Sequence, residues 1–342
     1  MPNNIAFARN YTAVIDEVYQ RASFSGVLNS GRRMVRAGHN AKEILIPKIS
    51  VTGLGNYTRN VGYKTGAITY EFETKTFNYD RGIRLFADVM DVEEAGVNDC
   101  FVEAGAELQR TQVAPEADAF TFAQIASHHG VTVKQENFDE YTEATTILSA
   151  LRQVTSDMDE KQVTLGSRYL FITPTLKGVL DDYSYANPTM SNRVLERFAR
   201  IVEVPQVRFY TAIDLLSGDD DQFGYQRAKG SYEQTTDSEP DPNKFYYTRT
   251  GSDPNYTYTV VEDPVASDMG SYYELVGRGE AINFMVVEKS AVIKFDKHVA
   301  SRVFSPDELE ALDSFMMKYR KYGIVELFDN KLDGVYVSAS TE

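Results

Sequence analysis

Residues 67–76 read AITYEFETKT, and the character of their side chains alternates from one position to the next. One set, mostly apolar, consists of Ile68, Tyr70, Phe72, Thr74 and Thr76. The set between them is charged and consists of Glu71, Glu73 and Lys75. Alternation with a period of two is the signature of a β-strand whose faces differ. The stretch therefore predicts a strand with one solvent-facing side and one side that needs a cover.

The segment before this strand has the composition of its pairing partner. Residues 44–51 read ILIPKISV, rich in β-branched side chains, with Pro47 suggesting an edge position. The glycine-rich residues 53–66 lie between the two runs, so we expect residues 44–87 to form one long β-hairpin. At about 3.3 Å per residue, arms of roughly 12 residues extend about 40 Å, and an isolated two-stranded ribbon is marginal in water. Such a ribbon needs another surface to lie on.

The first part of the chain differs electrically from the rest. Residues 1–48 carry seven Lys and Arg against three Asp and Glu, a net charge of +4 in a chain whose net charge is −15. Apolar side chains recur at the spacing of one helix face, at Tyr11, Val14, Ile15, Val18, Tyr19 and Ala22. Residues 23–40 hold three glycines and three arginines, which indicates a loosely ordered connector. We therefore predict that residues 1–43 form an arm on a flexible strap.

Length and composition are those of a folded protein. At roughly 150 residues per domain, 342 residues suggest about two domains, and 42% apolar with 25% charged residues are ordinary globular values. The negative net charge repels nucleic acid and anionic lipid at long range. Cys100 is the single cysteine, so no internal disulfide can form. With no signal-peptide pattern and no apolar run of about 18 residues, we expect a protein made in a reducing cytoplasm without a membrane segment.

Residues 91–130 have the pattern of a long helix. Asp91 and Glu94 fit a capping box, and apolar side chains follow at helical spacing. Proline removes a backbone donor, so Pro115 predicts a kink or break near Ala114, and we expect the helix to end by Gly130.

Residues 131–295 alternate between helical and strand patterns and predict an α/β module. Residues 169–173 are expected to form a buried strand, and residues 281–295 have the two apolar faces typical of a buried central strand. Within the module, residues 217–264 carry ten acidic against four basic residues, with repeated Gly, Pro and Tyr. We expect these residues to form a surface insertion with a small β element.

The C-terminal part, residues 296–342, predicts a helix followed by a hairpin. Ser305 and Pro306 suit a helix start, and Gly323 suits its stop. The apolar stripe expected for this helix consists of Leu309, Leu312, Phe315, Met316 and Tyr319. Residues 324–328 and 334–337 are expected to pair as a terminal hairpin.

The residue sets that catalysis or cofactor binding requires are not found. The sequence has no Gly-x-Ser-x-Gly elbow, phosphate loop, His-Glu-x-x-His motif or cysteine pair. His128 and His129 are adjacent and point to different sides of a helix end, and residues 219–221, three aspartates, lack the alternating ligands of a calcium loop. We therefore predict no catalytic, cofactor-binding or metal-binding residue and no enzyme. A glycosidase-type carboxylate pair stays open as an alternative, because acidic residues are plentiful.

In this order, the arm, hairpin, long kinked helix, α/β module and C-terminal part resemble the major capsid proteins of tailed bacteriophages with the HK97-type fold. The likeness covers nearly the whole chain and rests on sequence texture and order. The stretches that carry it are PNNIAFARNYTAVIDEVYQRAS at residues 2–23, VAPEADAFTFAQIAS at 113–127, YLFITPTLKGVL at 169–180, VPQVRFY at 204–210, INFMVVEKSAVI at 282–293, VFSPDE at 303–308 and YGIVELFDNKLDGVYV at 322–337. None of them is a catalytic motif.

The resemblance implies an α+β fold with five parts. These would be an N-terminal arm at residues 1–43, an extended β-hairpin loop at 44–90, the spine helix of a peripheral domain at 91–130, a central axial α/β domain at 131–295 with the polar insertion 217–264, and the C-terminal part of the peripheral domain at 296–342. The implied function is structural: self-assembly into the hexamers and pentamers of an icosahedral phage head around double-stranded DNA, without sequence-specific binding, cofactor or membrane. Portal and scaffold or decoration proteins are the implied partners, and the virion capsid, assembled in the host bacterial cytoplasm, is the implied location.

Contacts between copies are expected where one chain leaves apolar side chains uncovered. These assembly contacts are Tyr11, Val14, Ile15 and Val18 of the arm and Ile68, Tyr70 and Phe72 of the hairpin. Some members of the family crosslink a lysine of the extended loop to an asparagine of the peripheral domain. Lys64 and Asn330 correspond to these by position only, and we expect no crosslink.

Three other interpretations stay open. An encapsulin-like nanocompartment shell shares the fold but encloses enzymes, so a neighbouring gene for a cargo enzyme would favour it over a phage. A carboxylate-dependent hydrolase would elute as a monomer to tetramer, roughly 40–160 kDa, whereas a shell protein elutes as capsomers or particles. A phage tail or decoration protein would form tubes or trimers.

Overall fold

The chain divides into two units, each built from two separate stretches of sequence. The first unit is Met1–Ala114 with Lys289–Lys331, and the second is Pro115–Glu288 with Leu332–Glu342. The structure, a computed structural model, describes residues 22–30, 36–37, 43–57, 59, 62–90, 100–187, 193–240, 246–252, 255–261, 263–304 and 314–340. The predicted capping box at residues 91–94 and the predicted arm helix at residues 11–22 lie, except for Ala22, outside the described residues.

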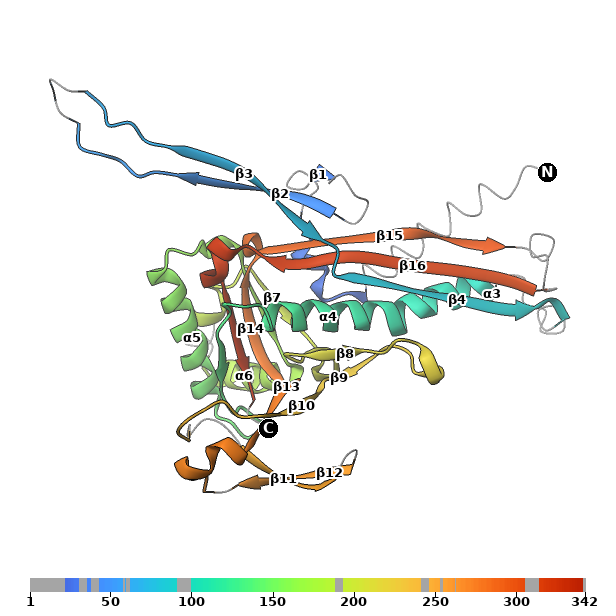
Figure 1. Cartoon of the computed structure of the whole chain (residues 1–342). Coiled ribbons are helices and arrows are strands. Elements are labelled where there is room, and N and C mark those ends of the chain that lie inside the picture. Colours follow the sequence, from blue (N-terminus) through green and yellow to red (C-terminus); the bar gives the residue numbers. More distant parts are fainter. Residues whose placement is uncertain are drawn as a thin grey trace. The chain divides into compact units, whose positions relative to one another are not determined.

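Two sheets form the first unit. One is antiparallel with the strand order β15–β16–β4, three long strands that lie side by side in Figure 1. The other has the order β1–β2–β3. The strands are β1 (Arg36–Ala37), β2 (Glu43–Val51), β3 (Ile68–Thr76), β4 (Tyr79–Asp88), β15 (Val292–Phe304) and β16 (Ser314–Leu327). The unit also holds the short 3-10 helix η1 (Ser25–Leu28) and the helix α3 (Cys100–Leu108).

The predicted hairpin of residues 44–87 is wrong in its second half. β2 pairs with β3 from Glu43 opposite Thr76 to Val51 opposite Ile68, but β4 then joins β16 in the other sheet. The alternation of side chains continues through β4, which is why the sequence carries no sign of the exchange. The prediction for Pro47 holds within the described residues: Pro47 pairs only with Phe72, because β1 reaches no further than Leu45.

The helix predicted after Ser305 is also wrong for its described residues, 314–323. Residues 314–327 form the strand β16, which includes Phe315, Met316 and Tyr319, while Leu309 and Leu312 lie outside the described residues. β16 is the middle strand of its sheet and pairs on both edges, so both faces bury apolar side chains. Because β16 has many apolar positions, some of them fall at the spacing of a helix face. Pairing with two long strands outweighs any local preference for a helix.

A helical segment runs from α3 through a π-helical turn at Gln109–Val113 into α4 (Ala114–Ala126). The disturbance predicted near Ala114 is therefore present as one widened turn just before Pro115, a feature that proline-containing helices show because a backbone bond is lost. The helix ends before Gly130, whose φ of +95° is open to glycine without strain.

A five-stranded sheet with the order β5–β17–β14–β6–β7 forms the centre of the second unit. β14 is buried at every position, as predicted for a central strand. The prediction of one strand over residues 281–295 is wrong, because a 3-10 turn at Lys289–Ala291 interrupts the run and Val292 begins β15 in the first unit. Helices α5 and α6 pack on the sheet through one apolar cluster that includes Leu151, Leu180 and Phe284. The elements are β5 (Val133–Gln135), α5 (Ala144–Glu160), β6 (Arg168–Ile172), α6 (Pro174–Ala186), β7 (Arg200–Glu203), β14 (Ile282–Glu288) and β17 (Val335–Ala339).

The insertion folds as small sheets of its own. β8 (Ile213–Leu215) pairs with β9 (Tyr225–Arg227), and a second sheet has the order β10–β13–β11–β12. Its strands are β10 (Lys229–Gln234), β11 (Tyr246–Ser252), β12 (Asn255–Val261) and β13 (Tyr273–Arg278). The expected small β element is present and extends past residue 264.

The predicted terminal hairpin is wrong. Residues 324–328 belong, up to Leu327, to β16 in the first unit, whereas β17 pairs with β14 and β5 in the second unit. The 3-10 segment η10 (Asp329–Gly334) between them carries the chain from one unit to the other. Two apolar runs joined by a short polar turn look the same in sequence whether they pair with each other or with distant strands.

Candidate assembly surface

The β2–β3 hairpin leaves its apolar side chains in solvent. Leu54 is fully exposed, and Ile68 is 75% exposed. The set, which we call the hairpin surface, consists of Val51, Leu54, Tyr57, Tyr63, Ile68, Tyr70 and Phe72. Several large apolar side chains exposed on one hairpin mark a candidate interaction site.

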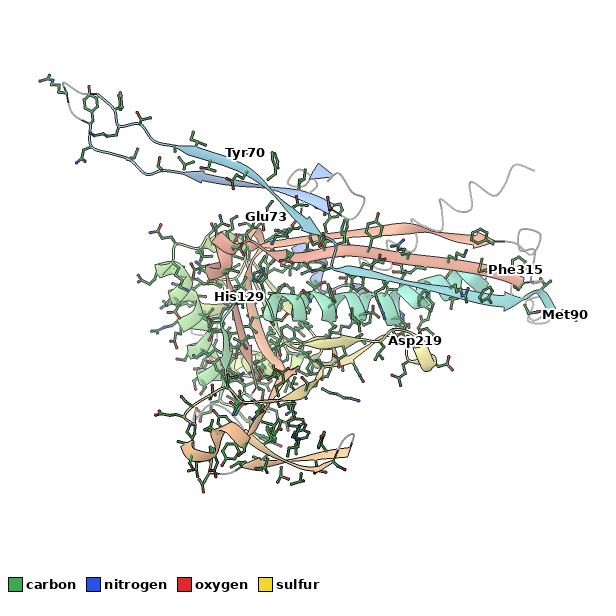
Figure 2. All side chains as sticks on the ribbon, in the orientation of Figure 1. Tyr70, Glu73, Met90, His129, Asp219 and Phe315 are labelled. Carbon is green, nitrogen blue, oxygen red and sulfur yellow. The ribbon has the colours of Figure 1, made fainter. Side chains whose placement is uncertain are left out.

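Aromatic pairs organise the hairpin surface before any partner binds. Tyr70 and Phe72 lie on one face of β3 with ring centroids 5.1 Å apart in an edge-to-face arrangement, and Figure 2 places Tyr70 along the hairpin. Tyr57 and Tyr63 face each other across the tip at 5.0 Å. Such pairs limit the rotamer freedom that a side chain would otherwise lose on binding.

Near its base, the charged face of β3 is covered better than the apolar face. Glu73 and Lys75 are half-buried, while Thr74 and Thr76, on the other face, are exposed. Lys75 donates to Glu73 at 3.0 Å, which raises the pKa of its ammonium, and lies 4.0 Å from Glu326. The chain therefore supplies a cover for the polar side of this strand and leaves the apolar side open.

The base of the hairpin is fixed to the first unit by a small apolar cluster. Ile44 of β2 packs with Ile293 of β15 and Ile324 of β16, all nearly fully buried. Phe77, which follows β3, packs on this cluster and meets Tyr322 edge to face at 5.1 Å. A ribbon that is marginal by itself is thus held at one end by packing.

The strap before the hairpin is more ordered than predicted. Leu28 is fully buried, and the Ser30 hydroxyl donates to the Val292 carbonyl at 3.1 Å. The buried Lys294 ammonium donates to the Ser25 hydroxyl. The prediction of a loosely ordered connector is wrong for residues 25–30, because a buried ammonium requires oxygen partners that these residues supply.

Of the predicted assembly contacts, the structure places Ile68, Tyr70 and Phe72 together on the hairpin surface. Tyr11, Val14, Ile15 and Val18 lie outside the described residues. The reasoning from sequence missed Val51, Leu54, Tyr57 and Tyr63, although a run of glycines interleaved with large apolar side chains marked them. Lys64 and Asn330 are both exposed in the first unit.

No group of three or more potential metal ligands occurs among the residues that the structure describes. Residues 219–221 form an exposed 3-10 turn, in which Asp219 accepts a hydrogen bond from Ser217 at 2.7 Å. His128 and His129 follow the end of α4. In the described part of the chain, no helix is both long and apolar enough to span a bilayer.

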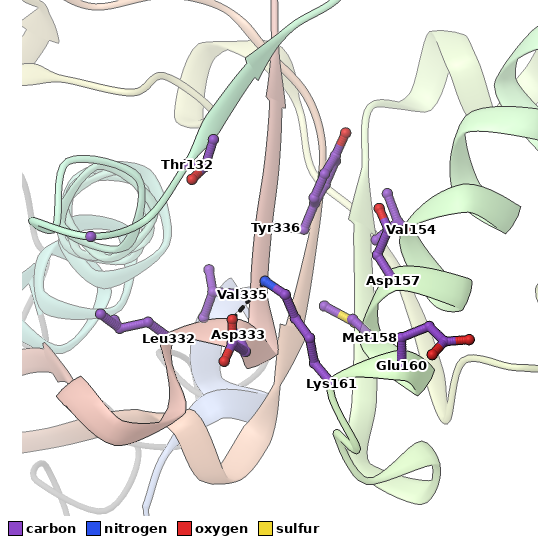
Figure 3. Close-up of a pocket in the computed structure, with 11 residues that line it drawn as sticks. Thr132, Val154, Asp157, Met158, Glu160, Lys161, Leu332, Asp333, Val335 and Tyr336 are labelled. Atoms are coloured by element: carbon purple, nitrogen blue, oxygen red, sulfur yellow. Dashed lines mark hydrogen bonds and ion pairs between the residues drawn. The ribbon is translucent and has the colours of Figure 1, made fainter.

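A pocket of about 460 Å³ in the second unit was not predicted. It lies between the end of α5 and the start of β17, with Val154, Met158, Leu332, Val335 and Tyr336 providing its apolar surface (Figure 3). Its polar lining consists of Thr132, Asp157, Glu160, Lys161 and Asp333. Burial raises the pKa of the Tyr336 hydroxyl, and the carboxylate of Glu136 adds to this, so the hydroxyl stays a hydrogen-bond donor at neutral pH. The pocket is lined by two segments that are far apart in the sequence, residues 130–161 and 332–336. The fold brings them together, so no local sequence pattern predicts the pocket.

Comparisons with known proteins yield likeness in structure only. No family model and no curated protein matches the sequence. The capsid of cyanophage P-SCSP1u is similar at 13% identity and a TM-score of 0.52, over 92% of this chain and 87% of that chain. A virus-like particle from Pyrococcus furiosus is similar at 8% identity and a TM-score of 0.50, over 96% and 98%. A structure of Mycobacterium phage Che8 is similar at 9% identity and a TM-score of 0.50, over 93% and 90%.

These likenesses extend over nearly the full length of both chains, so they are not limited to one shared motif. At identities of 8 to 13% they establish fold and leave function open. The α+β class and the fold implied by the sequence resemblance are confirmed: the chain has the HK97-type fold of viral capsid proteins.

Proposed function

We propose that this chain is a structural, non-catalytic major capsid protein that self-assembles into the hexamers and pentamers of an icosahedral phage head enclosing double-stranded DNA. The observation that carries the proposal is the hairpin surface, an apolar face on a ribbon that is fixed at its base and uncovered along its length. Its capsid-type fold supports the same conclusion.

In an assembly of many copies, a neighbouring copy can cover such a ribbon, and each single contact can be small. A surface that fits a different patch on the next copy makes a head-to-tail contact, and repetition of that contact closes into a ring when the rotation allows it. Each interface needs only about 1,000 Å² of buried surface for specificity, because contacts in a closed shell reinforce one another. The arm of residues 1–43 adds further contacts through Tyr11, Val14, Ile15 and Val18.

The acidic body suits a container for DNA. With a net charge of −15, the chain repels phosphate at long range, so packaged DNA slides along the shell without tight or sequence-specific binding. Portal and scaffold or decoration proteins complete the particle, which assembles in the host bacterial cytoplasm and becomes the capsid of the virion. If an electrostatic map of assembled particles showed a strongly positive inner surface, the proposed repulsion between shell and DNA would be wrong.

The decisive experiment is electron microscopy of the purified chain in negative stain, with size-exclusion chromatography. We expect capsomers or closed shells well above the 38.5 kDa of one chain. A stable monomer whose hairpin resists protease would overturn the proposal, since its ribbon would then be covered within one chain. In a denaturing gel after boiling, we expect a monomer band, because no crosslink between Lys64 and Asn330 is proposed.

A second function on the same fold is an encapsulin-like compartment shell. The likeness to a virus-like particle that spans 98% of that chain favours it. The contents separate the two functions: particles from the native source that hold nuclease-protected DNA indicate a phage head, and particles that hold one cargo enzyme indicate a compartment.

A further inference from the structure

Four tyrosine rings form a continuous array on the sheet β10–β13–β11–β12 of the second unit, whose strands are labelled in Figure 1. Tyr232 of β10 and Tyr258 of β12 stack face to face, with ring centroids 3.8 Å apart and ring planes 6° from parallel. Tyr247 of β11 meets Tyr232 edge to face at 5.0 Å, and Tyr273 of β13 meets Tyr258 at 5.6 Å. Each strand of the sheet therefore contributes one ring.

The array lies apart from the apolar core of this sheet. That core is a cluster of Tyr246, Met269 and Tyr272, which are nearly fully buried. Tyr246 and Tyr247 are neighbours along β11, so their side chains point to opposite faces of the sheet. The four rings of the array are only half-buried. Small solutes therefore reach the array from solvent.

The stacked pair bridges two halves of the sheet that share little backbone pairing. β10 pairs with β13 in one half, and β11 pairs with β12 along its full length in the other. Between the halves, the described pairing of β11 with β13 is limited to Tyr246 and Tyr247. A covalent bond between Tyr232 and Tyr258 would therefore fasten one half of the sheet to the other.

We propose that Tyr232 and Tyr258 are a site of oxidative crosslinking, at which a one-electron oxidant from outside the chain joins the two rings as dityrosine. Two equivalents of the oxidant each remove one electron, and each phenol releases its hydroxyl proton to water. The two phenoxyl radicals couple through a ring carbon ortho to each oxygen, and the hydrogen of each of these carbons moves to the oxygen and restores the phenol. In total, two electrons and two protons leave, one C–C bond forms and two ring C–H bonds break.

The geometry favours this pair over another tyrosine pair of the described chain. Carbon atoms in van der Waals contact lie about 3.5–4.0 Å apart, so the stacked rings of Tyr232 and Tyr258 already touch. Within the described residues, neither hydroxyl forms a hydrogen bond, so its proton is free to pass to solvent. Tyr57 and Tyr63 of the β2–β3 hairpin are tilted by 52° at 5.0 Å, and Tyr63 is 89% exposed. Radicals of that pair are therefore more open to other reactions.

Photo-oxidation of the full-length chain at low protein concentration, with tris(bipyridine)ruthenium and persulfate, tests the site. Light and persulfate generate ruthenium(III), a one-electron oxidant. After digestion with trypsin, the proposed bond links the peptide of residues 230–244 to the peptide of residues 250–278. We expect this linked pair to be the most abundant dityrosine product. The oxidised chain should still run as a monomer in a denaturing gel, because both rings belong to one chain.

Two variants assign the bond. Tyr258→Phe keeps a ring in the stack but has no phenol to oxidise, so the linked pair of peptides should be lost. This loss is informative because Tyr256, Tyr272 and Tyr273 lie in the same peptide and stay available. Tyr141→Phe is the matched control: it removes a tyrosine that is 85% exposed and should leave the yield of the linked pair unchanged. The oxidised parent should also melt at a higher temperature than the oxidised Tyr258→Phe chain, because a crosslink restricts the unfolded chain.

Two results would overturn the crosslinking site. One is an oxidised, folded parent in which Tyr57 and Tyr63 are linked while Tyr232 and Tyr258 are not. The other is an equal yield of the linked peptides from a chain unfolded in urea, because the fold would then play no part in bringing the rings together. Either result leaves the shell function intact, since that function depends on contacts between chains. A chain that never assembles would overturn the shell function and leave this site standing.

Discussion

The side chain of Asn78 bonds Val325 in the way that a strand backbone would. Its Nδ2 donates to the Val325 carbonyl at 2.8 Å, and its Oδ1 accepts from the Val325 amide at 3.1 Å. Asn78 stands between β3 and β4, where the chain leaves the hairpin and enters the three-stranded sheet. The side-chain amide of Asn78 thus extends the hydrogen bonding along β16 beyond the β4–β16 pair, at the point where the chain passes from one sheet to the other.

Asn78→Asp should destabilise the chain by about 1–3 kcal/mol, because the Val325 carbonyl loses its donor and faces a carboxylate. Urea unfolding of the unassembled chain measures this as a lower midpoint. The control Asn56→Asp changes an exposed asparagine of the tip and should leave the midpoint unchanged. Equal midpoints for both variants would show that the Asn78 bonds contribute nothing net.

Gly279→Ala should prevent the second unit from folding normally. A Cβ at Gly279 would lie 2.1 Å from the Ala212 carbonyl oxygen, a backbone atom that cannot move without breaking the pairing around it. Gly178→Ala is the matched control, because a Cβ there meets nothing within 4 Å in the helix α6. It should raise stability by up to about 1 kcal/mol, since alanine favours helix over glycine. Soluble expression and thermal midpoint compare the two, and a Gly279→Ala chain as stable as the parent would contradict the close approach.

Asp159→Asn should lower stability at neutral pH and lose its effect in acid. Hydrogen bonding and charge from the fully buried Arg168, with Arg197 adding charge, hold the pKa of the Asp159 carboxyl below its usual range. A carboxyl whose folded pKa is depressed stabilises the fold above its unfolded pKa of about 3.9, and this contribution disappears as pH falls through the folded value. We expect about 1 kcal/mol at pH 7, because the carboxylate is 43% exposed and solvent screens it.

Urea midpoints of parent and Asp159→Asn at pH 7, 5, 4 and 3 give the measurement. Their separation should be constant from pH 7 to 5 and should shrink below pH 4. Glu140→Gln changes an exposed carboxylate and serves as the control, with no separation at any pH. A separation that persists unchanged at pH 3 would assign the loss to packing rather than to charge.

Tyr70→Thr/Phe72→Thr should abolish assembly without unfolding the chain. Both side chains are exposed, so their removal exposes no core, yet it takes most of the aromatic area from the β3 part of the hairpin surface. Thr74→Ser/Thr76→Ser changes the same face nearer the base and should assemble normally. Light scattering follows assembly, and thermal melting follows the fold. Assembly of the aromatic variant at parental concentration would show that this face is not a contact.

Several elements could be predicted because their reasons are local. Pro115 disturbs its helix wherever that helix packs, and the apolar run from Phe284 to Val287 in β14 requires burial on both faces. The alternation from Ile68 to Thr76 required a strand with one face in need of a cover. Local sequence does not say which surface covers that face. In the described part of the chain, Ile68, Tyr70 and Phe72 stay exposed.

Other elements depended on partners that are distant in sequence. Phe315, Met316 and Tyr319 fit a helix stripe until pairing of β16 with both β15 and β4 placed them in a strand. Ser25 looked like part of a loose strap, but the buried Lys294 lies 269 positions away and donates to its hydroxyl. The acidic pocket arises only where the end of α5 meets the start of β17.

Sequence by itself determined where apolar surface had to be covered and where the backbone could not continue, because periodicity, charge and proline act over a few residues. Only the tertiary structure decided which strands pair, which cations are buried and where an acidic hollow opens, because each of these depends on contacts between segments far apart in the chain. The free energy of those contacts exceeds the local preference of a segment for helix or strand. Contacts between distant segments, and not the local sequence pattern, therefore determine which strands pair.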